Sequence, residues 1–143
     1  MVADRGTVRQ GPSAKRERYV LDKKTQSPFL IVELRILFMM STFTTRVQLN
    51  GDPSEAEYES LHKEMHRRGF SRFIQSTDGK WYRLPHAEYN RNAEATCEQV
   101  RTDASAAAKA AAPTRGHKVL VSVASQRCWI GLEEVTAEVA RGA

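Results

Sequence analysis

Two histidines four residues apart, His62 and His66, are the first residues whose types and spacing could do chemistry. That separation places two side chains on one face of a helix, where imidazoles can bind zinc. The local sequence is H-K-E-M-H, so its acid is neither second, as in H-E-x-x-H, nor fourth, as in the inverted motif. We therefore predict no metal site and interpret the pair as histidines on a solvated helix face.

Motifs for nucleophilic and nucleotide chemistry are missing from the sequence. It contains no G-x-S-x-G, no Walker loop and no G-x-G-x-x-G. Cys97 and Cys128 form no C-x-x-C pair, and neither has an identifiable base nearby in the sequence. We expect no cofactor. The cysteine usage is typical of a reduced, cytoplasmic protein.

A cluster of basic and aromatic residues remains between positions 66 and 86. Strand aromatics flanked by arginine and lysine can stack on the bases and bind the phosphates of single-stranded RNA. The same composition also occurs on ordinary charged surfaces, and both interpretations stay open. Trp81 and Tyr82 are adjacent on a strand and point to opposite faces, so we expect one of them in the core. The cluster consists of His66, Arg67, Arg68, Arg72, Lys80, Trp81, Tyr82, Arg83 and His86.

The net charge of +5 is concentrated outside this cluster. Residues 1–39 hold eight basic against four acidic residues, whereas residues 40–143 hold 14 against 13. Duplex DNA binding without sequence preference needs many phosphate contacts, so bulk charge gives it little support. Any nucleic-acid site must be local.

The elements that would position these residues begin with a strand and a helix. Phe43, Thr45, Val47 and Leu49 alternate with polar residues, which predicts a half-buried strand. The segment 52–55 then predicts a helix with Asp52 as N-cap, Pro53 in the first turn and Glu55 closing a capping box; Gly69 ends this helix.

The rest of the chain predicts a hairpin, a second helix and further strands. Residues 70–75 and 80–89 flank Asp78-Gly79, a strong hairpin signal. Thr96 and Gln99 form a capping box before an alanine-rich helix that stops at Pro113. Residues 118–125 alternate as a strand, and residues 128–132 predict a short extra strand.

This element order, β-α-β-β-α-β with a short C-terminal strand, predicts an α+β fold of the ferredoxin-like sandwich type. Two helices would cover one sheet face and leave the other open to solvent, a ligand or a second subunit. We expect one domain over residues 41–135, with residues 1–40 outside the fold and residues 136–143 frayed.

The segment 1–40 is a basic and apolar leader. Glu33 and Arg35 interrupt its apolar stretch, and no small-x-small cleavage site follows, so it does not fit a signal peptide. We expect translation to begin at Met39 or Met40; a membrane-surface or partner-binding tail is the alternative. No apolar run is long enough for stable membrane insertion.

The stretch from Arg46 to Asn90 resembles a known family. Its first strand, its helix ending at Gly69-Phe70, and the strings S-R-F-I, D-G and R-L-P-H-A-E-Y-N are similar to the GhoS-type endoribonuclease antitoxins of type V toxin–antitoxin systems. The resemblance extends over residues 43–125. It implies a ferredoxin-like protein that cleaves the messenger RNA of a membrane toxin without dependence on a tightly bound metal.

The resemblance also implies roles for particular residues. The family carries arginines in the middle turn of its first helix, whereas residues 59–63 here read E-S-L-H-K, so either His62 takes over as acid or base or activity is lost. The implied catalytic residues are His62, Lys63 and Arg67. The implied contacts to single-stranded RNA are Arg68, Arg72, Lys80, Tyr82, Arg83 and His86. The alternative is a non-catalytic regulatory or phage-derived module that uses the open sheet face for a homodimer or a protein partner.

Overall fold

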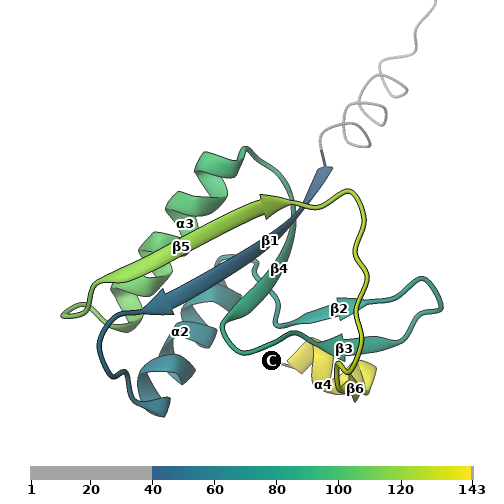
Figure 1. The fold of residues 1–143 in the computed structure, drawn as a ribbon, viewed down its shortest axis with the longest axis horizontal. Helices are drawn as coiled ribbons and strands as arrows, with labels where there is room; N and C mark the ends of the chain where they lie inside the picture. Colours follow the sequence, from purple (N-terminus) through teal and green to yellow (C-terminus); the bar gives the residue numbers. More distant parts are fainter. Residues whose placement is uncertain (1–39, 143) are drawn as a thin grey trace, which may run out of the picture.

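The computed structural model describes residues 40–142, which form a mixed α+β fold of two small antiparallel sheets and three helices (Figure 1). Our expectations for residues 1–39 lie outside this range. The elements in chain order are β1 (Met40–Leu49), α2 (Glu55–Arg67), β2 (Phe73–Gln75), β3 (Trp81–Arg83), β4 (Glu88–Glu94), α3 (Cys97–Ala111), β5 (His117–Val123), β6 (Glu134–Val135) and α4 (Ala137–Gly142).

The first sheet has the order β4-β1-β5, with β1 in the centre. Phe43 lies opposite Arg91 of β4 and Val123 of β5. The predicted alternation along β1 is confirmed, because Phe43, Thr45 and Val47 are buried beneath the helices and the residues between them are not. Both α2 and α3 lie on the same side of this sheet, which leaves its other face without a helix (Figure 1).

Small side chains bring α3 close to the sheet. Ala104, Ala107 and Ala108 are fully buried, as the alanine-faced pattern predicted, and the helix begins with the predicted Thr96–Gln99 capping box. Leu61 and Met65 of α2 complete the core from the neighbouring helix, and both are inaccessible to solvent. The main core therefore lies between one face of β4-β1-β5 and the two long helices.

The second sheet, β2-β3-β6, grows from the predicted hairpin around Asp78-Gly79. The strand expected over residues 80–89 is divided, however. Pro85 cannot donate to a ladder, and Ala87 adopts a φ of 61°, so the chain turns after Arg83. It then starts β4, which pairs with β1. Ser71 and Asn90 exchange backbone hydrogen bonds of 2.8 and 2.7 Å and link the two sheets.

Three further expectations differ from the structure. The N-cap of α2 is Ser54, not Asp52, and Glu57 closes its capping box. Residues 128–132 form no strand; the short strand β6 comes later and pairs with β3. Residues 136–143 were expected to fray, but α4 forms there and buries Ala140. In each case the local sequence pattern was too short to determine where the helix or strand begins, and contacts with distant segments determine it instead. No helix within residues 40–142 is long and apolar enough to cross a bilayer.

Candidate functional site

His62 stands on the inner side of α2 and is only 8% exposed. Its Nδ1 lies 2.7 Å from the hydroxyl of Tyr89 on β4. Burial lowers the pKa of His62 from 6.5 to about 4, and the positive charge of Arg72 acts in the same direction. The imidazole is therefore neutral at neutral pH and cannot serve as a charged general acid there.

The hydrogen bond to Tyr89 determines where the ring proton of His62 lies. Burial raises the pKa of Tyr89, so its phenol keeps its proton. A phenol is a better donor than acceptor, and a neutral imidazole nitrogen is a good acceptor, so we assign the Tyr89 hydroxyl as donor to Nδ1. The proton of His62 then lies on Nε2. No hydrogen-bond partner for Nε2 occurs within residues 40–142, which leaves it available to a ligand.

Two cavities flank His62, and we call them together the His62 site. One, of about 320 Å³, is lined by Pro53, Glu55, Tyr58, Glu59, His62, Arg72 and His86. The other, of about 360 Å³, is lined by Glu59, His62, Lys63, His66, Arg67, Arg72 and Gly142. His62 and Arg72 line both, so a ligand in either cavity meets these two side chains.

Aromatic packing holds His86 next to His62. The ring of Tyr58 packs edge-on against His86 with centroids 4.4 Å apart, and the rings of His62 and His86 are 5.9 Å apart. His86 comes from the loop between β3 and β4, whereas the other two residues come from α2. Thus the turn at Pro85, which divides the expected strand, is what brings His86 to the site.

Arg72 supplies a cation that the described part of the chain does not neutralise. Among residues 40–142 its side chain has no hydrogen bond and no ion pair; Lys63 has none either. Arg67 is bound to Glu64 at 2.6 Å but remains exposed to solvent. Glu59 is the nearby carboxylate, and its charge opposes the lowering of the His62 pKa. Glu55 and Glu59 line the first cavity together with Arg72, whereas Lys63, Arg67 and Arg72 outnumber Glu59 in the second, so positive groups are in the majority only in the second cavity.

Not every residue predicted from the sequence reaches this site. The structure brings together His62, Lys63, Arg67, Arg72 and His86. The other predicted RNA contacts point elsewhere and have partners of their own. Arg68 binds Glu64 at 2.7 Å, Lys80 binds Glu134 at 3.4 Å, Arg83 binds Glu133 at 3.1 Å, and Tyr82 packs against Trp129.

Sequence reasoning missed three neighbours of His62. Tyr58 precedes it by one helical turn, so the helical spacing could have indicated that contact. Glu59 lies three residues before His62, so the helical spacing could have indicated it as well. Tyr89 is 27 residues away, and no local pattern pairs it with His62. The expectation that Trp81 or Tyr82 lies in the core is wrong, since both are half-buried.

Within residues 40–142 no group of three or more His, Cys, Asp or Glu side chains is arranged to hold a metal ion. Comparison with protein-family models, curated proteins and solved structures found no match to the chain.

Proposed function

We propose that this chain is a small RNA-binding protein that binds the backbone of single-stranded RNA at the His62 site. The observation that carries the proposal is the unneutralised guanidinium of Arg72 in a cavity shared with His62 and His86. Guanidinium groups bind phosphate through paired, charge-assisted hydrogen bonds. Imidazole N–H groups add hydrogen-bond donors, and Tyr58 lines the same cavity as an aromatic neighbour for an unstacked base.

We also propose that the fold is a ferredoxin-like sandwich of the GhoS type. The bridge between Ser71 and Asn90 sets the start of β2 beside β4. Extended in this way, the strand order is β5-β1-β4-β2, and both long helices cover one face. That order is the one a ferredoxin-like sandwich has. The β3-β6 pairing and α4 are additions at the edge.

RNA cleavage is the further step of the same proposal. Scission without a metal needs a base that takes the proton of the 2′-hydroxyl as this oxygen bonds to phosphorus, cations that stabilise the negative charge on the phosphorane oxygens, and a proton from solvent for the 5′-oxygen that leaves. Arg72, Lys63 and Arg67 would supply the cations. With its proton on Nε2, His62 would donate a hydrogen bond to the phosphate, and the neighbouring His86 is then the candidate base.

RNA binding can be measured by fluorescence anisotropy with a labelled 20-nucleotide single strand and the full chain. Removing one charge-assisted contact should weaken binding about tenfold, so we expect that loss for Arg72→Gln. Arg101→Gln is the matched control, because it removes an equal charge from the exposed surface of α3. Equal affinities for the two variants would contradict the assignment of Arg72.

Cleavage is tested by incubating the same RNA with the chain in EDTA and separating the products on a denaturing gel. We expect products ending in a 2′,3′-cyclic phosphate. His86→Gln should slow their appearance more than it weakens binding. Intact RNA, or cleavage unchanged in both His62→Ala and Arg67→Ala, would remove the catalytic assignments and leave a binding protein.

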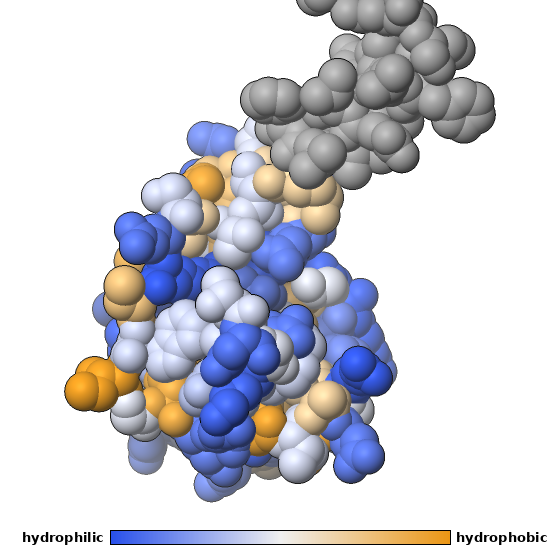
Figure 2. Space-filling model, turned by 90° about the vertical axis from the view of Figure 1, so that its right-hand side faces the viewer, coloured by the Kyte–Doolittle hydropathy of each residue, from blue (hydrophilic) through white to orange (hydrophobic). Residues whose placement is uncertain are grey.

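A protein-interaction module is the second candidate. Leu120 and Val123 on the edge strand β5 are 65% and 58% exposed, and β5 offers an open hydrogen-bonding edge within residues 40–142. Figure 2 shows that the face on the side of β2 and β3 is mainly hydrophilic with scattered apolar groups. A dimer in sedimentation experiments that Leu120→Lys dissociates, together with no affinity for RNA, would favour this candidate.

A further inference from the structure

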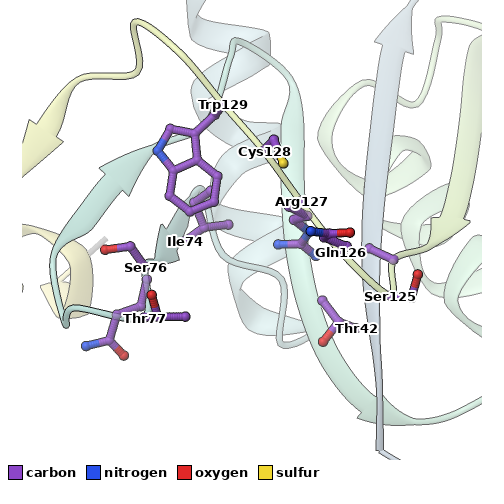
Figure 3. Close-up of a pocket in the computed structure, with 11 residues that line it drawn as sticks. Thr42, Ile74, Ser76, Thr77, Ser125, Gln126, Arg127, Cys128 and Trp129 are labelled. Carbon is purple, nitrogen blue, oxygen red and sulfur yellow. The ribbon is translucent and has the colours of Figure 1, made fainter.

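A second polar cavity lies between β2 and the segment 124–129 that follows β5 (Figure 3). Its volume is about 520 Å³, and an adjoining cavity of about 310 Å³ reaches β4. Thr42, Ile74, Gln75 and Arg127 line both. None of these residues lines the His62 site, so the two sites are separate. Volumes of this size are typical of small-molecule sites.

Arg127 is the central charged group of this cavity. Its Nε is buried without a hydrogen-bond partner, and its Nη2 donates to the backbone carbonyl of Phe43 at 3.4 Å, a long contact. Burial lowers the pKa of Arg127, but the guanidinium stays charged. Among the described residues, no Asp or Glu lines either cavity. A half-buried arginine without a carboxylate is costly unless an anion occupies the space beside it.

Asn90, which lines the smaller cavity, carries a buried acceptor. The side-chain oxygen of Asn90, Oδ1, is buried and has no hydrogen-bond partner. Asn90 and Arg127 both line the smaller cavity, together with Asn92 and Gln75. Asn92 already accepts a hydrogen bond of 2.9 Å from Thr42. The cavity therefore leaves one donor and one acceptor unsatisfied, and a simple anion could satisfy only the donor.

Aromatic rings border both cavities. Trp129 lies over Ile74 at the mouth of the larger cavity (Figure 3) and is 37% exposed. Tyr82 packs against Trp129 with the ring centroids 5.5 Å apart and the ring planes tilted by 58°. Trp81 lines the smaller cavity. An indole face that is both held and exposed can stack on a planar ring.

We propose that the two adjoining cavities together bind a nucleotide, with the phosphate on Arg127, which lines both, an amino group of the base on Asn90 Oδ1 in the smaller cavity, and the base face against Trp129 in the larger one. A nucleotide combines the anion, the donor and the planar ring that the three features require. It could be a free mononucleotide or one unit of an RNA chain. In the second case the inference rests on the proposed RNA-binding function.

The two tryptophans of the chain both border these cavities, so intrinsic fluorescence reports on them directly. We expect AMP to quench the fluorescence of the full chain in a saturable way, whereas inorganic phosphate at the same concentration should not. An absent or unsaturable response to AMP overturns the proposal. Equal affinity for phosphate and AMP overturns it too, because the base would then contribute nothing.

Two variants separate this cavity from the His62 site. Arg127→Gln should weaken AMP binding about tenfold, and Arg101→Gln should leave it unchanged. Arg72→Gln should lower the affinity for RNA but leave the AMP-induced quenching unchanged, because neither tryptophan lines the His62 site; failure here and failure of the proposed function are therefore distinguishable. Unchanged AMP affinity in a folded Arg127→Gln chain contradicts the site.

Because Arg127 also contacts the backbone of β1, its replacement could unfold the chain. Spectra of the wild-type chain labelled with ¹⁵N avoid that difficulty. AMP should shift the side-chain amide signal of Asn90 and the indole signal of Trp129, and signals from α3 should not move. An RNA oligomer that shifts the same two signals identifies the nucleotide as part of a chain; a shift with AMP alone identifies a free nucleotide. AMP-induced shifts elsewhere only would overturn the proposal.

Discussion

Arginines differ sharply in their surroundings in this protein, and the difference indicates which of them can bind ligands. Arg68, Arg83 and Arg115 each bind a glutamate at 3.1 Å or less. Arg72 and Arg127 line cavities and have no carboxylate partner among residues 40–142. An arginine that already has a carboxylate must give it up before it binds phosphate, so Arg72 and Arg127 are better phosphate ligands than these three paired arginines.

His62 should make the stability of the fold depend on pH. Its pKa is about 4 in the folded chain against 6.5 ordinarily, so between these values the unfolded chain binds more protons. The stabilising contribution is complete above pH 6.5 and is lost as the pH falls toward 4. Arg72 and His86 lower this pKa and Glu59 raises it, while Tyr89 contributes its hydrogen bond.

Urea unfolding at several pH values between 6.5 and 4 tests this expectation. The free energy of unfolding should fall with pH less steeply in His62→Gln than in the wild type. His66→Gln is the control, because it makes the same replacement at an exposed position of the same helix. Parallel slopes for His62→Gln and the wild type would show that His62 titrates normally.

For single residues, the sequence indicated which residue types take part in the sites but not which side chains contact one another there. The predicted catalytic residues and Arg72 do meet, because four-residue spacing on α2 and the following turn bring them to one place. Tyr89 and Arg127 had no local signal. Tyr89 reaches His62 only after β4 pairs with β1, and Arg127 reaches its cavity only after the chain returns past β2.

Among the elements, α2 shows how a distant contact selects one of two local patterns. Asp52 with Glu55 and Ser54 with Glu57 both fit a capping box. The structure adopts the second because Arg115, in the loop before β5, binds Glu57 at 2.6 Å and also the carbonyl of Asp52 at 3.0 Å. This contact lowers the pKa of Glu57 to about 2. Arg115 is 58 residues from Glu57 in the sequence, so no pattern within the helix could indicate this contact.

Replacing the true cap should cost stability where replacing a neighbouring serine does not. Ser54→Ala removes the hydroxyl that accepts from the backbone N–H of Glu57, and we expect a loss of about 1 kcal/mol in the free energy of unfolding. Ser60→Ala on the exposed face of α2 should change it by less than about 0.5 kcal/mol. Chemical denaturation measures both, and equal losses would mean that Ser54 is not the cap.

Because β4 consists mainly of polar residues, the sequence pattern did not identify it as a separate strand. Only its alternate residues face the helices: Tyr89 is buried, and Arg91 lies with its guanidinium 4.9 Å from the ring centre of Phe70. An arginine that covers an aromatic ring fills a core position without an apolar signal. The sequence thus predicted the two long helices, β1, β5 and the hairpin. It could not separate β3 from β4 or foresee β6 and α4, which depend on pairing with β3.

For the whole molecule, charge is unevenly distributed along the chain, so the proposed RNA binding can be tested by measuring the affinity for RNA at several salt concentrations. Residues 40–143 carry a surplus of one positive charge, with 14 basic against 13 acidic residues, so long-range attraction of RNA by this part is weak. Binding would then depend on the few cations at the His62 site, namely Lys63, Arg67 and Arg72. Each phosphate contact to a single strand contributes about −0.7 to the slope of log K against log salt.

Three such contacts predict a slope of about −2 for the full chain, measured by anisotropy from low to physiological salt. Arg72→Gln should reduce its magnitude by about 0.7, and Arg101→Gln should leave it unchanged. A slope steeper than about −4 would require more phosphate contacts than the His62 site provides. The eight basic residues of segment 1–39 would then be the place to look, and charge reversal there would identify them. A shallow slope that Arg72→Gln reduces by about 0.7 would instead assign one of the phosphate contacts to Arg72, in the loop before β2.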